Sequence, residues 1–245
     1  RCAGHGIIYP GPRPLAQLEQ ADWELHCPHC GEYLQPVLID EAASHPHTAY
    51  GISKYAVEML ALRLGQRYGI PSVSVRYTYV QGPRNSFYNA YSGICRIFTL
   101  RILNGLAPVV YEDGRQLRDF LDVSDVARAN VLLMERPEAD YRVFNVGPGR
   151  ATTVLDFARL VLRVAGSDLE PVISGQYRVG DTRHTVSDIS ALASLGWSAD
   201  IPLDRTIERY IEWIRPFSNT RDYLDAAEAA MRSQNVVRLA TGRQS

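Results

Sequence analysis

Residues 49–83 read AYGISKYAVEMLALRLGQRYGIPSVSVRYTYVQGP, and this stretch decides the fold. Residues 49–68 predict a helix, because apolar side chains recur at the spacing of one helix face, at Ala56, Met59, Leu60 and Leu64. Gly69 stands at the natural helix end. Residues 72–77 then predict a strand, which Gly82-Pro83 closes. A helix, a turn and a strand in this order are typical of alternating α/β folds.

The same alternation continues toward the C-terminus. Helical patterns and extended segments follow one another, the helices at 92–104, 124–134, 153–164, 203–214 and 223–232 and the strands at 109–111, 120–123 and 143–146. We expect Asp122 or Ser124 to cap the second of these helices, and Thr153 with Asp156 forms a capping-box pattern for the third, which Gly166 ends. The chain after 48 therefore predicts one α/β unit with a substrate-facing lobe in its second half.

The segment before it, residues 1–47, has a different character. Prolines at six positions interrupt it and predict irregular structure, with one short strand at 37–39. The chain opens on Arg1 without an initiator methionine or an opening strand, and we expect that it is a truncated form. A form that starts here by design is the alternative.

Composition narrows the class of protein. Of the 245 residues, 46% are apolar and 22% are charged, which is the balance of an ordinary globular protein. The formal net charge of -1 gives no electrostatic reason to expect nucleic acid or an anionic membrane surface as a partner. The sequence also lacks an apolar run of the roughly 18 residues that a membrane span needs, so we expect no membrane span.

Tyr50 and Lys54 form the central chemical motif. Residues four apart share one face of a helix, so both side chains are expected to point the same way. A tyrosine ionises near pH ~10, and a neighbouring ammonium group favours the phenolate and lowers that pKa. Such a phenolate can take a proton from a sugar hydroxyl while hydride leaves the same carbon. A surface helix with one aromatic and one charged residue is the simpler interpretation of these two residues alone.

A family resemblance becomes specific at this point. The motifs YGISKY (50–55), GIPSVSVRY (69–77) and QGP (81–83) are followed by YEDGRQLRDF (111–120), DVSDV (122–126), FNVG (144–147) and RVGD (178–181). In this order they resemble the extended short-chain dehydrogenase/reductase family, and within it the NAD-dependent nucleotide-sugar epimerases and dehydratases. The resemblance covers about 49–215. It implies a partial Rossmann-like fold, a doubly wound parallel sheet, with a C-terminal substrate-binding lobe.

The resemblance also assigns residues. It implies that Tyr50 is the catalytic base and that Lys54 is its partner and holds the ribose of NAD. Arg118 and Arg178 would bind the diphosphate of a nucleotide sugar, since guanidinium groups pair with phosphate oxygens in a bidentate manner. An ordinary surface ion pair is the alternative for either arginine. Asp181 would bind the nucleotide ribose. Val109 would line the base pocket or be plain core.

The sequence departs from the family pattern in two ways. The glycine-rich turn G-x-x-G-x-x-G that cradles the NAD pyrophosphate is absent, as are the acidic residue that reads the adenosine ribose and a candidate catalytic Ser or Thr. The chain should therefore bind NAD poorly. In addition, Tyr79 stands where the family often has an asparagine, which leaves the contact to the sugar diphosphate and the sugar itself undecided.

Cys2-x-x-His5 and Cys27-x-x-Cys30 form two paired metal-ligand spacings. Three thiolates and one imidazole make a closed tetrahedral site, which predicts structural zinc. Glycines at 4, 6 and 31 suit the tight turns of such knuckles. A Cys27–Cys30 redox pair, unrelated thiols, and His26 or His29 as ligands are the alternatives. The insertion resembles that of a bacterial subgroup with dTDP-L-rhamnose 4-epimerase-like proteins. Reduced thiols point to the cytoplasm, and Cys95 is expected to be a buried inert thiol.

We therefore expect three regions: a zinc-knuckle insertion (1–47), the second half of an NAD-binding domain intertwined with a nucleotide-sugar-binding lobe (48–218), and a C-terminal tail (219–245). The expected function is epimerisation at C4 of a dTDP- or UDP-hexose. A nucleotide-sugar 4,6-dehydratase and a non-catalytic fragment are the alternatives. A homodimer through the helix that carries Tyr50 is expected by resemblance.

Overall fold

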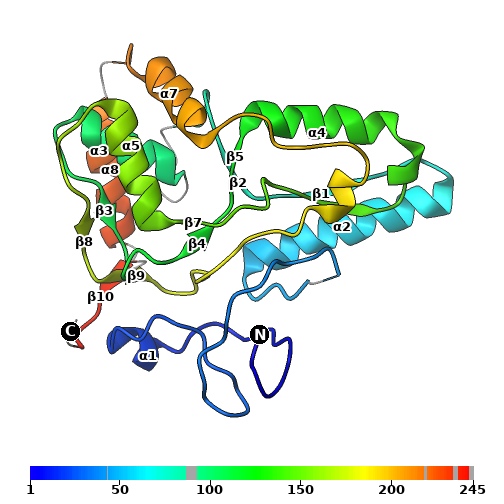
Figure 1. The fold of residues 1–245 in the computed structure, drawn as a ribbon, viewed down its shortest axis with the longest axis horizontal. Coiled ribbons are helices and arrows are strands. Elements are labelled where there is room, and N and C mark those ends of the chain that lie inside the picture. Colours follow the sequence, from blue (N-terminus) through cyan, green and yellow to red (C-terminus); the bar gives the residue numbers. More distant parts are fainter. Residues whose placement is uncertain (43, 87–92, 218–219, 234–236, 243–245) are drawn as a thin grey trace.

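The computed structural model describes residues 1–42, 44–86, 93–217, 220–233 and 237–242 (Figure 1). The fold is α/β. Its helices are α1 (Leu15–Glu19), α2 (Ala49–Tyr68), α3 (Ile94–Leu103), α4 (Val123–Glu135), α5 (Val154–Ala165), α6 (Ser190–Ala193), α7 (Leu203–Ile214) and α8 (Thr220–Ser233), with a 3-10 turn at Pro137–Ala139. Its strands are β1 (Ser74–Tyr77), β2 (Tyr79–Gln81), β3 (Val109–Val110), β4 (Leu117–Arg118), β5 (Phe120–Asp122), β6 (Val143–Val146), β7 (Thr152–Thr153), β8 (Val172–Ile173), β9 (Gln176–Arg178) and β10 (Val237–Leu239).

Parallel pairing joins strands that are far apart in the chain. β1 pairs with β6, β2 with β5 and β3 with β8, all in parallel, whereas β4–β7 and β9–β10 are antiparallel. Each ladder in the described residues contains two strands, so the doubly wound sheet expected from the sequence is present only as short parallel pairs. Along the chain, α4 connects β5, which pairs with β2, to β6, which pairs with β1.

Two hydrophobic cores hold the helices on these strands. In the larger, α3, α5 and α7 pack around Phe157 and Phe120, whose rings are stacked at 4.0 Å. The smaller core packs α4 against β6 through Leu133, Phe144 and Val146. In Figure 1, α4 and α2 flank β1 from opposite sides. The strands therefore lie between two helical layers in this part of the molecule.

Helix ends follow the predicted chemistry. The N–H of Ser124 donates to Asp122, which settles the choice of cap for α4 in favour of Asp122. The capping box of α5 is confirmed, because the Asp156 N–H donates to the Thr153 hydroxyl at 3.0 Å. Gly69 ends α2 with φ 67°, a left-handed conformation that a residue without Cβ adopts at little cost.

The apolar side chains of α2 are not buried. Met59, Leu60 and Leu64, which the spacing placed on one face, are 47%, 60% and 49% exposed, so this face is not covered by the described residues. Only Glu58 and Gly65 of this helix are buried. The helix is tied to β1 by the Glu58 carboxylate, which accepts from Arg76 at 2.7 and 2.8 Å. Apolar residues lie around the whole circumference of α2, and β1 covers one side of it.

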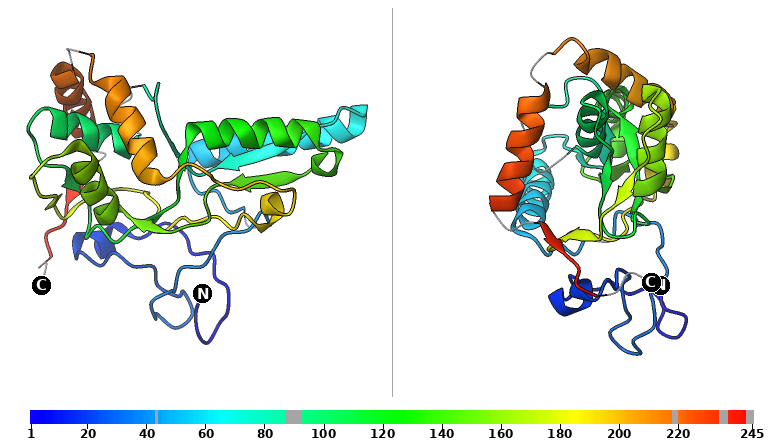
Figure 2. Two further views of the ribbon diagram at one scale, coloured as in Figure 1. Left: turned by 45° about the horizontal axis from the view of Figure 1, so that its top comes forward. Right: turned by 90° about the vertical axis from the view of Figure 1, so that its left-hand side faces the viewer.

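The N-terminal arm (residues 1–47) and the last segment both join the body. The arm contains α1, a short helix that the proline pattern had not predicted, and its expected strand 37–39 is reduced to a single bridge between Ile39 and Ser187. Figure 2 shows the arm below the body with the C-terminal end of the chain beside it. Helix α8 places Leu224 in the larger core, and β10 pairs with β9. Among the described residues, none of the helices combines the length and the apolar character needed to cross a membrane.

Candidate functional site

Tyr50 and Lys54 lie on one face of the first turns of α2. The Lys54 ammonium group is 5.5 Å from the centroid of the Tyr50 ring, so the helix brings the two side chains together as the spacing predicted. Thr48 caps the helix by accepting the N–H of Gly51 at 3.1 Å. Tyr50 is 73% exposed, and a ligand in solution can therefore reach its hydroxyl.

A second group of predicted residues meets around β4. The Arg118 guanidinium lies 5.1 Å from the Tyr79 ring centroid and 3.8 Å from the Asp181 carboxylate. Burial raises the pKa of the Tyr79 hydroxyl against the opposing effect of Arg118, so Tyr79 is neutral at physiological pH. The Arg118 guanidinium therefore lies close to both the Tyr79 phenol and the Asp181 carboxylate, and the three residues come from three separate segments.

Main-chain carbonyls of the protein already use part of the hydrogen-bonding capacity of Arg118. Its Nη1 donates to the carbonyl oxygens of Leu117 and Arg183, at 3.0 and 2.8 Å, and its Nη2 donates to that of Thr182 at 2.7 Å. Three of the five N–H donors of a guanidinium are used in this way, so at most two remain for a phosphate. The side chain is buried, and these carbonyls fix its direction.

The two remaining predicted residues of the binding lobe are Arg178 and Val109. Arg178 ends β9, with its guanidinium 5.6 Å from the Tyr111 ring centroid. Its carbonyl accepts the N–H of Asp181 at 3.3 Å, so a tight turn joins Arg178 to the segment that holds Arg118. Val109 pairs with Val172 in the β3–β8 ladder and is half-buried.

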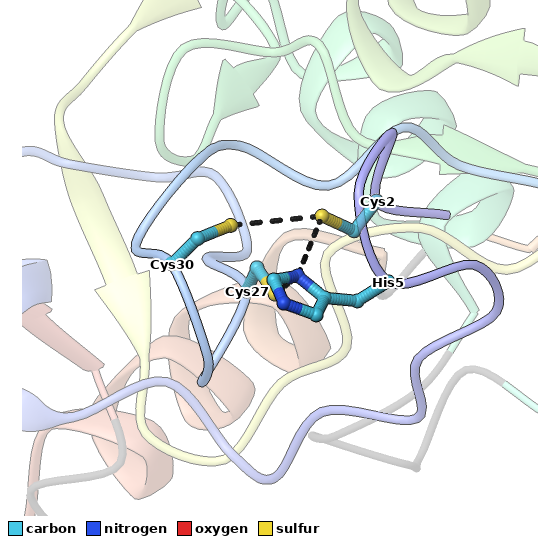
Figure 3. A group of neighbouring side chains, drawn as sticks. All are labelled: Cys2, His5, Cys27 and Cys30. Carbon is cyan, nitrogen blue, oxygen red and sulfur yellow. Dashed lines mark hydrogen bonds between the residues drawn. The ribbon is translucent and has the colours of Figure 1, made fainter.

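Cys2, His5, Cys27 and Cys30 converge in the arm (Figure 3). Their ligand atoms all lie within 4.8 Å of one another. The Cys2 sulfur is 3.4 Å from His5 Nδ1 and 3.6 Å from the Cys30 sulfur, and the Cys27 sulfur is 3.6 Å from His5 Nδ1. The hydrogen bond from His5 lowers the pKa of Cys2 to about 6. This donor set and its closeness fit a tetrahedral metal such as zinc.

Contacts of the neighbouring histidines bear on whether His26 or His29 could be a metal ligand. His26 is held away from the cluster, because Nε2 contacts the Asp22 carboxylate at 2.7 Å and Nδ1 the Gly31 carbonyl at 2.9 Å. The His29 ring centroid lies 5.0 Å from that of His5, with the two rings tilted by 41°. Gly6 and Gly31 close the two knuckles with φ 71° and 76°. The prediction that Cys95 is buried is confirmed, since it is 1% exposed and burial raises its pKa to about 12.

Sequence reasoning missed a buried ionic cluster between the arm and the body. Arg183, whose side chain is 0% exposed, binds Glu24, Glu112 and Asp113 at 2.6 to 2.7 Å. Arg13 adds a second cation on Glu112 at 2.7 Å. A hydrogen bond from His184, helped by Arg183, lowers the pKa of Glu24 to about 2. No local pattern in the sequence marks these residues as partners, because they come from segments far apart in the chain.

Asp119 is a further buried carboxylate that the sequence did not mark. It is 0% exposed and accepts the N–H groups of Ser187 and Arg150 at 3.0 and 3.4 Å. Burial raises the pKa of Asp119 to about 6. It joins β4–β5 to the loops at Arg150 and Ser187, beside the place where Arg118 lies.

The parallel strand pairs and the helices packed on them are typical of a Rossmann-like α/β protein, and one of these helices carries the Tyr-x-x-x-Lys spacing. A profile of the NAD dependent epimerase/dehydratase family matches residues 30–147, which include Tyr50, Lys54, Tyr79 and Arg118. Residues 30–147 therefore carry part of a domain of this family.

Individual relatives agree with this assignment. A dTDP-L-rhamnose 4-epimerase from Burkholderia thailandensis is 35% identical over 209 residues, which are 85% of this chain and 56% of the relative. Relatives named as 4,6-dehydratases also occur. The chain spans little more than half the length of the first of these relatives.

Solved structures match the fold. A UDP-glucose 4-epimerase from Thermotoga maritima, solved with UDP-glucose, has a TM-score of 0.69 and 36% identity, covering 76% of this chain and 60% of that one. A UDP-glucose 4-epimerase from Thermus thermophilus, in complex with NAD, has a TM-score of 0.64 and 27% identity, covering 82% and 62%.

Proposed function

We propose that this chain carries the catalytic helix and the substrate-binding lobe of an NAD-dependent nucleotide-sugar 4-epimerase. The observation that carries the proposal is the pairing of Tyr50 with Lys54 on the exposed start of α2, within the range that the family profile matches. Relatives named as 4-epimerases, among them one for dTDP-L-rhamnose, favour this activity over others of the family.

Tyr50 acts as the base. Its phenolate takes the proton of the C4 hydroxyl, and the Lys54 ammonium group favours that phenolate electrostatically. NAD, when bound, supplies the acceptor for the hydride that leaves C4 and the donor that returns it. Tyr50 then gives the proton back to the C4 oxygen after the keto sugar has turned its other face, so no net oxidation results.

Residues of the chain suit NAD only in part. Lys54, exposed beside Tyr50, can hold the nicotinamide ribose. The 245 residues contain no G-x-x-G-x-x-G turn for the pyrophosphate, so we expect weak NAD binding by the chain itself. Arg118 and Arg178 bind the diphosphate of the nucleotide sugar, Arg118 through the N–H groups that the main chain leaves open, and Asp181 binds the ribose.

The Cys2–His5–Cys27–Cys30 cluster holds a structural zinc ion in this proposal. All four donors are protein side chains, which leaves no ligand position for substrate. Metal analysis of pure protein should find about one equivalent of zinc, and much less than half an equivalent would contradict the site.

The remaining expectations belong to the whole protein. Ile52, Val57 and Leu60 are exposed on the apolar surface of α2. This surface suits a homodimer contact, and other parts of the complete fold can also cover some of it. Four unpaired thiols favour the cytoplasm. We keep the division into 1–47, 48–218 and 219–245 as regions, although contacts join all three.

The decisive experiment supplies dTDP- and UDP-hexoses with NAD and follows the products by NMR. The test protein includes any coding sequence that continues in frame upstream. Interconversion of C4 epimers supports the proposal, and a 4-keto-6-deoxy product would instead establish the dehydratase alternative that some relatives represent. A stop codon directly upstream and no turnover would favour the non-catalytic fragment.

A further inference from the structure

The arm reaches the Arg118 segment through Glu24. One Glu24 carboxylate oxygen accepts from Arg183 Nε and Nη2, at 3.1 and 2.6 Å. The other oxygen contacts His184 Nε2 at 2.9 Å. Glu24 stands three residues before Cys27, inside the loop that the Cys/His cluster closes. A single arm residue therefore holds two consecutive residues of the body.

The same body segment holds Arg118 and its neighbour Leu117. The main-chain carbonyls of Thr182 and Arg183 accept from the Arg118 guanidinium. His184 Nδ1 accepts the N–H of Leu117 at 3.2 Å, so its Nε2 carries the proton that goes to Glu24. The chain of contacts runs from Glu24 through Arg183 and His184 to both sides of the Leu117–Arg118 strand.

Arg13 provides a second connection. It binds both carboxylate oxygens of Glu112, at 3.0 and 2.7 Å, and donates to the main-chain carbonyl of Asp181 at 3.1 Å. Glu112 in turn accepts from Arg183 at 2.7 Å. The side chains of Arg13, Glu112 and Arg183 are 2%, 3% and 0% exposed. Bidentate pairs that are buried this deeply fix direction as well as distance.

We propose that Glu24 and Arg13 are positioning residues, which set the direction of Arg118 toward the diphosphate of the nucleotide and that of Asp181 toward its ribose. The Cys/His cluster acts on nucleotide affinity through them, because it fixes the loop on which Glu24 lies. The inference rests on the proposed function, since it takes Arg118 as a phosphate ligand.

The test measures binding of UDP and dTDP by calorimetry to the wild-type chain and to Glu24→Ala, Glu24→Gln, Arg118→Ala and the double variant Glu24→Ala/Arg118→Ala. We expect Glu24→Ala to weaken binding about tenfold, within the range of couplings between residues of one network. In the Arg118→Ala background, the same change should have no further effect. Glu24→Gln keeps an acceptor oxygen and should lie between wild type and Glu24→Ala.

A matched control is available in the arm itself. Asp22→Asn removes the half-exposed ion pair with His26. Among the described residues, Asp22 forms no hydrogen bond or ion pair with residues 181–184, so this change should leave nucleotide affinity within twofold. Removing the metal with a chelator should weaken binding by the wild type but leave Arg118→Ala unchanged.

The outcomes separate this inference from the function on which it rests. If the wild type binds neither nucleotide, the proposed function fails and the inference fails with it. If the wild type binds but Glu24→Ala and Glu24→Gln both bind within twofold of it, only the inference fails. Additive losses in the double variant would mean that Glu24 acts on stability in general and would also overturn the inference. Should Glu24→Ala not fold, Glu24→Gln decides the same question.

Discussion

The two halves of the candidate site are built in opposite ways. Arg118 is buried, and main-chain carbonyls of Thr182 and Arg183 hold its guanidinium. Tyr50 and Lys54 stand on the exposed first turns of a helix that packs against β1 in the described part of the chain. The binding half is therefore preorganised by the chain's own contacts, which reduces the ordering cost of binding a ligand. The catalytic half is an accessible pair whose surroundings must come from cofactor, substrate or further protein.

The largest effect should come from the exposed half. Tyr50→Phe removes the only group proposed to take the C4 proton, and general acid–base catalysis contributes roughly 10²–10⁴-fold. We expect the kcat of the NAD-loaded protein to fall by about that factor. The measurement is NMR of the sugar products. Nucleotide binding and thermal stability should not change.

The control for this change is Tyr68→Phe, at the other end of the same helix and 65% exposed. It should keep full turnover. Full turnover by Tyr50→Phe as well would show that the proton leaves by another route.

The second largest effect should come from the binding half, which contains Arg118 and the segment that holds it. Arg183→Met leaves Glu24, Glu112 and Asp113 without their shared cation, and removing one partner of a buried ion pair costs about 3–5 kcal/mol. Urea unfolding should show this loss. Arg205→Met, which removes an exposed pair with Glu208, should cause no comparable loss, because solvent screens such pairs. Equal costs would mean that the buried cluster does not hold the arm to the body.

The third effect depends on pH. Burial raises the folded-state pKa of Asp119 to about 6, above its unfolded value of 3.8. The folded state therefore holds the Asp119 proton more tightly than the unfolded state does. The stability that protonated Asp119 contributes is present below pH ~4. It is lost as the pH rises to about 6, and the loss is about 1–3 kcal/mol.

Asp119→Asn cannot ionise and should lack this dependence. The quantity to measure is the difference in unfolding free energy between wild type and Asp119→Asn at each pH, because other titrating groups then cancel. A difference that stays flat between pH 4 and 6 would contradict the raised pKa.

The smallest effect is expected on the exposed surface of α2, in contrast to the buried side of α3. Leu60→Ala on α2 removes a side chain that is 60% exposed and should change the stability of the monomer by less than about 0.5 kcal/mol. Leu100→Ala on α3, at 0% exposed, should cost about 2–5 kcal/mol. A cost for Leu60→Ala that grows with protein concentration would indicate that a second copy covers α2.

Much of the fold was predictable because its signals are local. Residue spacing predicted α2, Asp122 or Ser124 was expected to cap α4, and the Thr153–Asp156 capping box marked the start of α5; the structure has all three, with Asp122 as the cap. The convergence of Cys2, His5, Cys27 and Cys30 followed from the spacing within each pair. In the catalytic pair, one helical turn is enough to bring Lys54 to Tyr50.

The rest depended on contacts between distant segments. No local pattern shows that Arg183 binds Glu24, 159 positions away, or that the Arg118 guanidinium is held by carbonyls of 182 and 183. Which apolar face of α2 is covered was likewise outside the sequence, because burial is decided by what else packs nearby. The sequence by itself determined the helices, their caps and the chemical groups, since these follow from interactions a few residues apart. Only the tertiary structure decided how those groups are held, because ion pairs and burial join residues that the chain brings together after folding.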